Sequence, residues 1–164
     1  MELIRNVFVE KRLGFQQDAD ALKNELNEML GFNLSPRVLH LYQVRGLQDE
    51  QLNALKNTVF SDPQIDVVHE EPFSFLDEPH FLLELLPGQY DQRAEAVKEC
   101  ILLTLGLSDI EVRYKTLYVI PSATPAMLEE IKRYLLNPVE MREGMVEERF
   151  TEFPKKPLLV ETLK

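Results

Sequence analysis

The sequence repeats its own pattern once, with the second copy displaced by about 75 residues. The order of apolar runs, glycines and helix-like stretches is the same in both copies, and single-residue gaps are enough to align them. The matched pairs are VFVEKRLGFQQDADALKNELNEMLGF (7–32) with FLLELLPGQYDQRAEAVKECILLTLGL (81–107), RVLHLYQV (37–44) with RYKTLYVI (113–120), and LNALKNTVF (52–60) with LEEIKRYLL (128–136). We therefore predict an internal duplication, with repeats at residues 1–75 and 76–150.

Each copy is predicted to form the same βαβαβ unit, because apolar residues alternate in some runs and recur every three or four positions in others. Glycine turns mark some of the boundaries. Prolines mark others, because the residue before a proline avoids helical geometry. The elements expected in the first copy are strand 6–10, helix 17–30, strand 37–44, a helix from Gln48 to Asp62 and an extended piece 65–70. The second copy gives 80–86, 92–105, 111–120, a helix from Thr124 to Asn137, and 139–147.

Two units of this size cannot each bury both faces of a sheet on their own. Pairing them about a pseudo-twofold axis joins their sheets and creates one shared core. The predicted fold class is α+β, with about four helices packed on a common, largely antiparallel sheet over residues 1–150. Strand order stays open at this point. Residues 151–164 carry two prolines and no periodicity, and are expected to be a linker toward following domains of a longer protein.

The charge balance excludes some partners. Twenty-eight acidic side chains against 18 basic ones give a net charge of −10, which disfavours a nucleic-acid surface. Apolar runs are far shorter than the roughly 20 residues needed to cross a bilayer, and the first ten residues lack a secretory apolar segment. We therefore expect a cytoplasmic protein that binds neither nucleic acid nor membrane.

Few residues are candidates for chemistry. Cys100 is predicted to be a small buried thiol on the helix face that also carries Val97 and Ile101, since no turn or histidine would activate it. His40 lies within an apolar strand and is expected to be a sheet-face histidine. Neither His69 nor His80 stands at metal-ligand spacing with another histidine or cysteine. No catalytic, cofactor-binding or metal-binding residue is predicted.

The segment LLPGQYDQRAEAV (85–97) has the polarity of a ligand loop but only one glycine, where phosphate-binding loops need several. Asp91 is placed to cap the helix that begins at Gln92. Arg93 falls in the first turn, where the helix dipole disfavours a cation. A solvated arginine and an arginine held by a carboxylate of another domain are both open alternatives. We interpret the segment as a strand-to-helix corner that doubles as a docking surface, formed by Gln89, Tyr90, Asp91, Gln92 and Arg93.

The same segment carries a family resemblance. LPGQYDQRAEA (86–96) resembles the Leu-Pro-Gly-Gln-Phe-Asp-Gln-Arg-Ala signature of long-form phosphoribosylformylglycinamidine synthase, with Tyr90 where phenylalanine is usual. Four more segments match that family in the same order, so the resemblance extends over nearly the whole chain. They are VFVEKRLGF (7–15), YQVRGL (42–47), VFSDPQID (59–66) and YLLNPVEMRE (134–143).

This resemblance implies a PurS-like N-terminal domain, similar to a dimer of the small PurS subunit that replaces it in other organisms. The parent enzyme uses ATP, Mg and glutamine to make formylglycinamidine ribonucleotide, a step of purine biosynthesis. Those ligands belong to synthetase and glutaminase domains, which are the implied partners. The chain itself is then a non-catalytic structural and coupling domain that holds both parts together. The alternative is a stand-alone regulatory module that binds a small ligand between its two halves.

Overall fold

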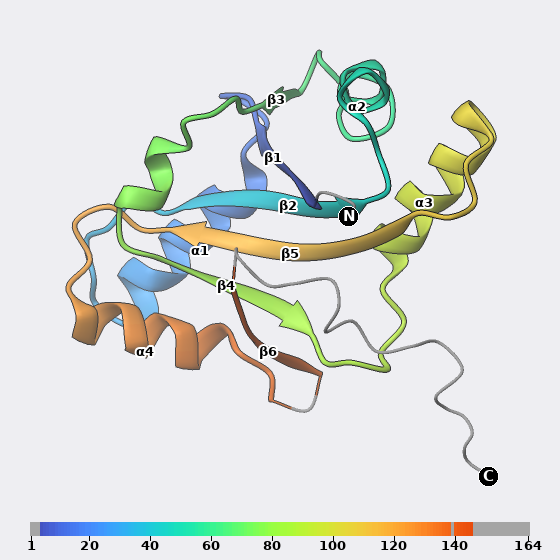
Figure 1. Cartoon of the computed structure of the whole chain (residues 1–164). Coiled ribbons are helices and arrows are strands. Elements are labelled where there is room, and N and C mark those ends of the chain that lie inside the picture. The colour runs from blue at the N-terminus through green and yellow to red at the C-terminus, as the bar shows by residue number, and fades with distance from the viewer. Residues whose placement is uncertain (1–3, 139, 146–164) are drawn as a thin grey trace, which may run out of the picture.

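The computed structural model describes residues 4–138 and 140–145, so the predicted linker 151–164 and part of the extended piece 139–147 lie outside the described residues. Within these ranges each half contributes strands and helices in the same order (Figure 1). The first half gives β1 (Ile4–Lys11), α1 (Gln17–Met29), β2 (Arg37–Arg45), α2 (Asp49–Leu55) and β3 (Asp66–Val68). The second gives β4 (His80–Leu85), α3 (Gln92–Leu105), β5 (Glu111–Val119), α4 (Pro125–Leu135) and β6 (Met141–Gly144), and a 3₁₀ turn (Ser74–Asp77) joins the halves.

The six strands form one sheet in the order β3-β1-β2-β5-β4-β6, with every neighbouring pair antiparallel. Counted from either edge inward, each half places its third strand first, its first strand second and its second strand at the centre. The halves join where β2 pairs with β5, in a register that sets His40 opposite Thr116. The predicted α+β class, with four helices on an antiparallel sheet, is confirmed. The duplication itself remains a prediction.

All four helices pack on one face of the sheet. Successive side chains of a strand point to opposite faces, so alternate residues show which face the helices cover. On β2, Tyr42 and Val44 join the cluster under α2 and α3, whereas Val38 joins the cluster under α1 and α4. The intervening Leu39 and Leu41 are fully buried on the opposite face. Figure 1 shows α1 and α4 next to each other near one end of the central strands and α3 near the other end. The helices therefore form two pairs, and each pair combines one helix from each half.

The second helix of the first half is shorter than predicted, ending at Leu55 instead of near Asp62. Leu55 and Phe60 are both buried in the same core cluster, which a continuous helix cannot achieve at that spacing. A tight turn forms instead, in which the Phe60 amide donates to the Leu55 carbonyl at 3.2 Å and the Ser61 hydroxyl donates to the Lys56 carbonyl at 2.6 Å. The Asn57-Thr58-Val59 run also has low helix propensity.

The prediction that Cys100 is buried is wrong. Helix α3 buries Ala94, Val97 and Ile101, and Cys100 is turned away from that stripe into solvent. One residue along a helix rotates the side chain by about 100°, so Ile101 and Cys100 cannot both face the core. The C-terminal part of α3 is apolar on several sides, which made the buried face hard to identify from the sequence.

The sheet face opposite the helices holds two buried carboxylates, one from each half, and both are only 8% exposed. Glu10 accepts two hydrogen bonds from Arg37, at 2.6 and 3.0 Å, and one from His69 Nε2 at 2.9 Å. Burial by itself would raise the pKa of Glu10, but the hydrogen bonds from His69 and Arg37 and the charge of Arg37 lower it to about 2. Glu84 accepts from Arg142 Nε at 2.5 Å.

None of the helices within residues 4–138 and 140–145 is long and apolar enough to cross a lipid bilayer.

Candidate functional site

A groove of about 300 Å³ lies on the helix side of the sheet, over the seam where the two halves join. We call it the central groove. Its walls come from α1 on one side and from the start of α3 and the end of α4 on the other. Because β2 and β5 pair through its floor, each half supplies part of the lining. The floor is formed by Val38, His40, Tyr114, Thr116 and Tyr118.

His40 is confirmed as a sheet-face histidine and is only 8% exposed. The Tyr114 hydroxyl is hydrogen-bonded to Nδ1 of His40 and lies 3.2 Å from Oγ1 of Thr116. Burial is the main reason that the pKa of His40 falls to about 4, and the charge of Arg93 lowers it as well. Burial also raises the pKa of Tyr114 to about 12. At neutral pH both rings are therefore uncharged, and the floor is polar without carrying charge.

Arg93 contacts two tyrosines, which neither sequence-based alternative included. Its guanidinium carbon lies 5.2 Å from the centre of the Tyr114 ring, and Nη1 donates to the Tyr42 hydroxyl at 3.4 Å. Arg93 is nevertheless solvent-exposed, and a carboxylate partner in another domain stays a prediction. In the described part of the chain no acidic side chain forms an ion pair with it. Stacking on the aromatic ring fixes the cation at the edge of the central groove.

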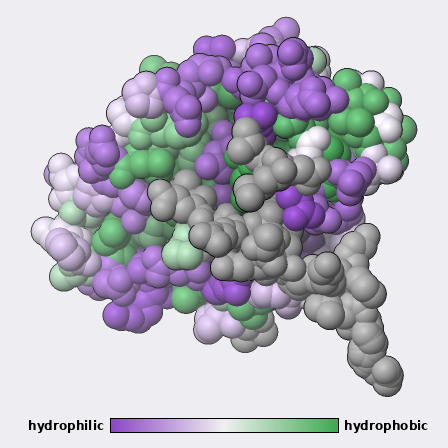
Figure 2. Space-filling model, viewed as in Figure 1, coloured by the Kyte–Doolittle hydropathy of each residue, from purple (hydrophilic) through white to green (hydrophobic). Residues whose placement is uncertain are grey.

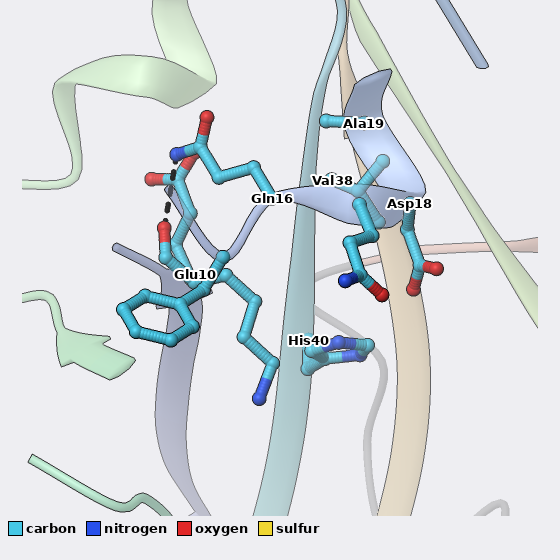
Figure 3. Close-up of a pocket in the computed structure, with 9 residues that line it drawn as sticks. Glu10, Gln16, Asp18, Ala19, Val38 and His40 are labelled. Carbon is cyan, nitrogen blue, oxygen red and sulfur yellow. Dashed lines mark hydrogen bonds between the residues drawn. The ribbon is translucent and has the colours of Figure 1, made fainter. Parts of the chain in front are cut away.

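Asp18 stands on the opposite wall, in the first turn of α1. The groove continues past it into a smaller hollow of about 100 Å³ beside the β1–α1 turn, which Asp18 and His40 also line (Figure 3). In Figure 3 the Asp18 side chain and the His40 ring lie on the same side of β2, and the side-chain amide of Gln16 donates to the Lys11 carbonyl at 2.9 Å. The Lys11 ammonium is engaged by Asp66 at 3.0 Å.

The corner at 85–97 is built as predicted. Gly88 has φ of +93°, and the Gln89 amide donates to the Leu86 carbonyl at 3.1 Å. Asp91 Oδ1 accepts from the Ala94 amide at 3.1 Å, so its role as the helix cap is confirmed. Burial raises the pKa of Asp91, and backbone hydrogen bonds from Ala94 and Arg93 partly offset this rise. Gly88 and Asp91 therefore serve to connect β4 to α3.

The five residues predicted as a docking surface separate into three environments. Arg93 lines the central groove, Asp91 caps α3 and Gln89 belongs to the turn. Tyr90, 75% exposed, and Gln92 line a shallow hollow along the outer side of α3 together with Leu102. Figure 2 shows apolar surface gathered over the outer end of α3, where Leu102 and Leu103 are exposed. Tyr90 and the outer side of α3 form a surface of mixed polarity that is distinct from the central groove.

Sequence reasoning missed Asp18 and Tyr114 as groove residues. A signal was available for Asp18, because it is the second residue of α1, just as Arg93 is the second residue of α3. Tyr114 gave none, since an aromatic residue in a strand is normally part of a core.

No family model matches this sequence, and no curated protein matches it either. Among residues 4–138 and 140–145 no three or more His, Cys, Asp or Glu side chains are arranged to hold a metal ion.

Proposed function

We propose that this chain is a non-catalytic structural and coupling domain of a phosphoribosylformylglycinamidine synthase, acting in the cytoplasm. It holds the ATP-dependent synthetase and the glutaminase together, so that ammonia released from glutamine reaches the synthetase. The five segments that resemble this family, in the same order along the chain, support the proposal. ATP, Mg and glutamine are bound by the other domains.

The observation that carries the proposal is how the corner at 85–97 is used. Its Gly88 and Asp91 serve the turn and the cap, whereas Tyr90 is exposed at a hollow along α3 that Glu95, Lys98, Glu99 and Leu102 also line. Exposed aromatic residues such as Tyr90 are enriched at protein–protein contacts. A rigid corner of this kind suits docking better than catalysis, because it presents side chains without a converging set of acids and bases.

The first test measures catalysis by the chain alone. We expect the purified chain to hydrolyse neither ATP nor glutamine above the buffer rate. Turnover of either compound that follows the folded chain through purification would contradict a purely coupling role.

The second test measures docking in the parent enzyme. Tyr90→Ala is expected to lower glutamine-dependent turnover several-fold while leaving ammonia-dependent turnover unchanged, since truncating an anchor residue at an interface commonly costs about 2 kcal/mol. Leu13→Ala is the matched control, because Leu13 is 89% exposed at the corresponding turn of the first half. Equal ratios of glutamine- to ammonia-dependent turnover in the two variants would contradict docking through Tyr90.

A second candidate, a stand-alone regulatory module, is favoured by one observation, the central groove between the halves. The two candidates differ in a measurable way, because a regulatory module does not require synthetase or glutaminase partners.

A further inference from the structure

Equivalent positions of the two halves bring opposite charges to the central groove. Asp18 is the second residue of α1 and Arg93 is the second residue of α3, and both line the groove across the seam. No ion pair joins them in the described part of the chain, although each lies within the electrostatic reach of the other. The groove therefore has a cation on one wall and an anion on the other, both on exposed side chains, with an uncharged polar floor between them.

We infer that the central groove is a binding site for a free α-amino acid with an uncharged side chain, whose carboxylate binds Arg93 and whose ammonium binds Asp18. This inference does not rest on the proposed coupling role, since it concerns the chain's own groove and applies equally to a coupling domain and to a stand-alone module.

The Arg93 side of the groove selects a carboxylate. The guanidinium is held over Tyr114 and spends one donor on Tyr42, which leaves other donors of its planar fork for a ligand. Its place in the first turn of α3 adds the positive end of the helix dipole. A planar carboxylate matches the fork geometry and compensates a cation that is otherwise poorly placed at a helix start.

The Asp18 side of the groove selects a cation and rejects a phosphate. Asp18 and Glu25 both line the α1 wall, and His40 is neutral at physiological pH, so it adds no positive charge. Lys11, the nearest other cation of the smaller hollow, is already paired with Asp66. A dianion would therefore meet one cation and two carboxylates in a protein of net charge −10. An α-amino acid carries its ammonium and its carboxylate on the same carbon, and each of these two groups meets one partner of opposite charge.

The middle of the groove fits an uncharged side chain. Leu22, Val38 and Tyr118 provide apolar contact, and the Thr116 hydroxyl provides a hydrogen-bonding group without charge. A volume of about 300 Å³ lies at the lower end of the usual range for small-molecule sites, which suits a molecule the size of an amino acid. Because α1 and α3 belong to different halves, such a ligand would connect the two halves across the seam.

The test is calorimetric titration of the purified chain with each uncharged L-α-amino acid in turn. We expect at least one to bind with saturation below about 10 mM, and its analogues lacking either charge to bind at least tenfold more weakly. For L-leucine these analogues are 4-methylpentanoate, which lacks the ammonium, and 3-methylbutylamine, which lacks the carboxylate. Absence of binding by every uncharged amino acid would overturn the inference. Inorganic phosphate binding more tightly than the best amino acid would do the same.

Paired variants then locate the site. Arg93→Gln and Asp18→Asn are each expected to weaken binding of the best amino acid by about tenfold or more, because each removes one charged hydrogen-bond partner. Arg133→Gln and Asp20→Asn are the matched controls, since both residues are exposed and neither lines the groove. Urea unfolding of all four variants checks that the fold is retained. Binding that is equally strong in folded Arg93→Gln and Arg133→Gln would refute the assigned site.

Discussion

The two strand-to-helix corners of the molecule share a backbone turn but differ in side-chain chemistry. Gly14 between β1 and α1 and Gly88 between β4 and α3 both have φ of +93°. The helix of the second corner is capped by Asp91, whose carboxylate accepts from the Ala94 amide. The first helix has Gln16 at its N-cap position and no side-chain cap, because the Gln16 amide is turned back to the Lys11 carbonyl.

This difference shows that the direction of the chain and the chemistry of the corner are set by separate residues. A glycine at positive φ is enough to turn the strand, since side chains with a Cβ are disfavoured there. The N-cap residue and the second residue of the helix can then differ between the two corners. Asp91 caps α3 whereas α1 has no side-chain cap, and the second residues, Asp18 and Arg93, carry opposite charges. Equivalent scaffolds in the two halves thereby give one groove with two unlike walls.

The largest effect is expected from Glu10, one of the two buried carboxylates on the sheet face opposite the helices. A pKa of about 2 in the folded protein, against an ordinary 4.5, corresponds to about 3 kcal/mol of stability. This stability is present above pH 4.5 and is lost as the pH falls toward 2, because the unfolded chain takes up the proton first. Glu10→Gln should therefore lower the free energy of unfolding by about 3 kcal/mol at neutral pH and by much less near pH 2. Urea unfolding across this pH range tests it. A pH-independent difference would contradict the assigned role of the carboxylate.

The turn glycines come next. Gly88→Val and Gly14→Val should each cost about 2 kcal/mol, since a β-branched side chain at this φ is strained. No other atom lies within 4 Å of an added Cβ at either position, so strain and not a clash sets both costs. Urea midpoints of the two variants should agree. A clear difference between them would break the equivalence of the two corners.

The caps should behave differently. Asp91→Ala is expected to cost about 1 kcal/mol, because the Ala94 amide loses its acceptor. Gln16→Ala should cost less than about 0.5 kcal/mol, since Gln16 makes no capping hydrogen bond. Thermal or urea unfolding distinguishes the two values, and equal losses would show that the contrast between the caps has no energetic consequence.

The smallest effect is expected for Arg93 in the chain without ligand. Arg93→Gln should lower stability by about 0.5 kcal/mol, the size of an exposed cation–π contact. Arg133→Gln, which loses no such contact, should be neutral. A loss well above 1 kcal/mol for Arg93→Gln would instead assign Arg93 a mainly structural role.

Much of the fold was predictable because local patterns decided it. The boundaries of α3, the cap at Asp91 and the first-turn proline of α4 follow from short-range chemistry, and all three are confirmed. The early end of α2 was not predictable, since it depends on Leu55 and Phe60 both reaching a core that includes β1 and α3. The exposure of Cys100 was missed for a related reason: α3 is apolar on more sides than the core covers.

The groove was the least predictable feature. Strand order decides that β2 lies beside β5, and only this pairing brings His40 next to Thr116 and Tyr42 within reach of Arg93. Strand order could not be read from the sequence, so the alternatives for Arg93 were limited to water and to a carboxylate elsewhere. The contacts of Arg93 with Tyr114 and Tyr42 depend on how the elements pack together.

Removal and addition of the chain would test the coupling role most directly. On the proposed function, the synthetase and glutaminase parts prepared without this chain should keep ammonia-dependent turnover and lose glutamine-dependent turnover, and the purified chain added in trans should restore the latter. Glutamine-dependent turnover that persists in full without the chain would contradict the account.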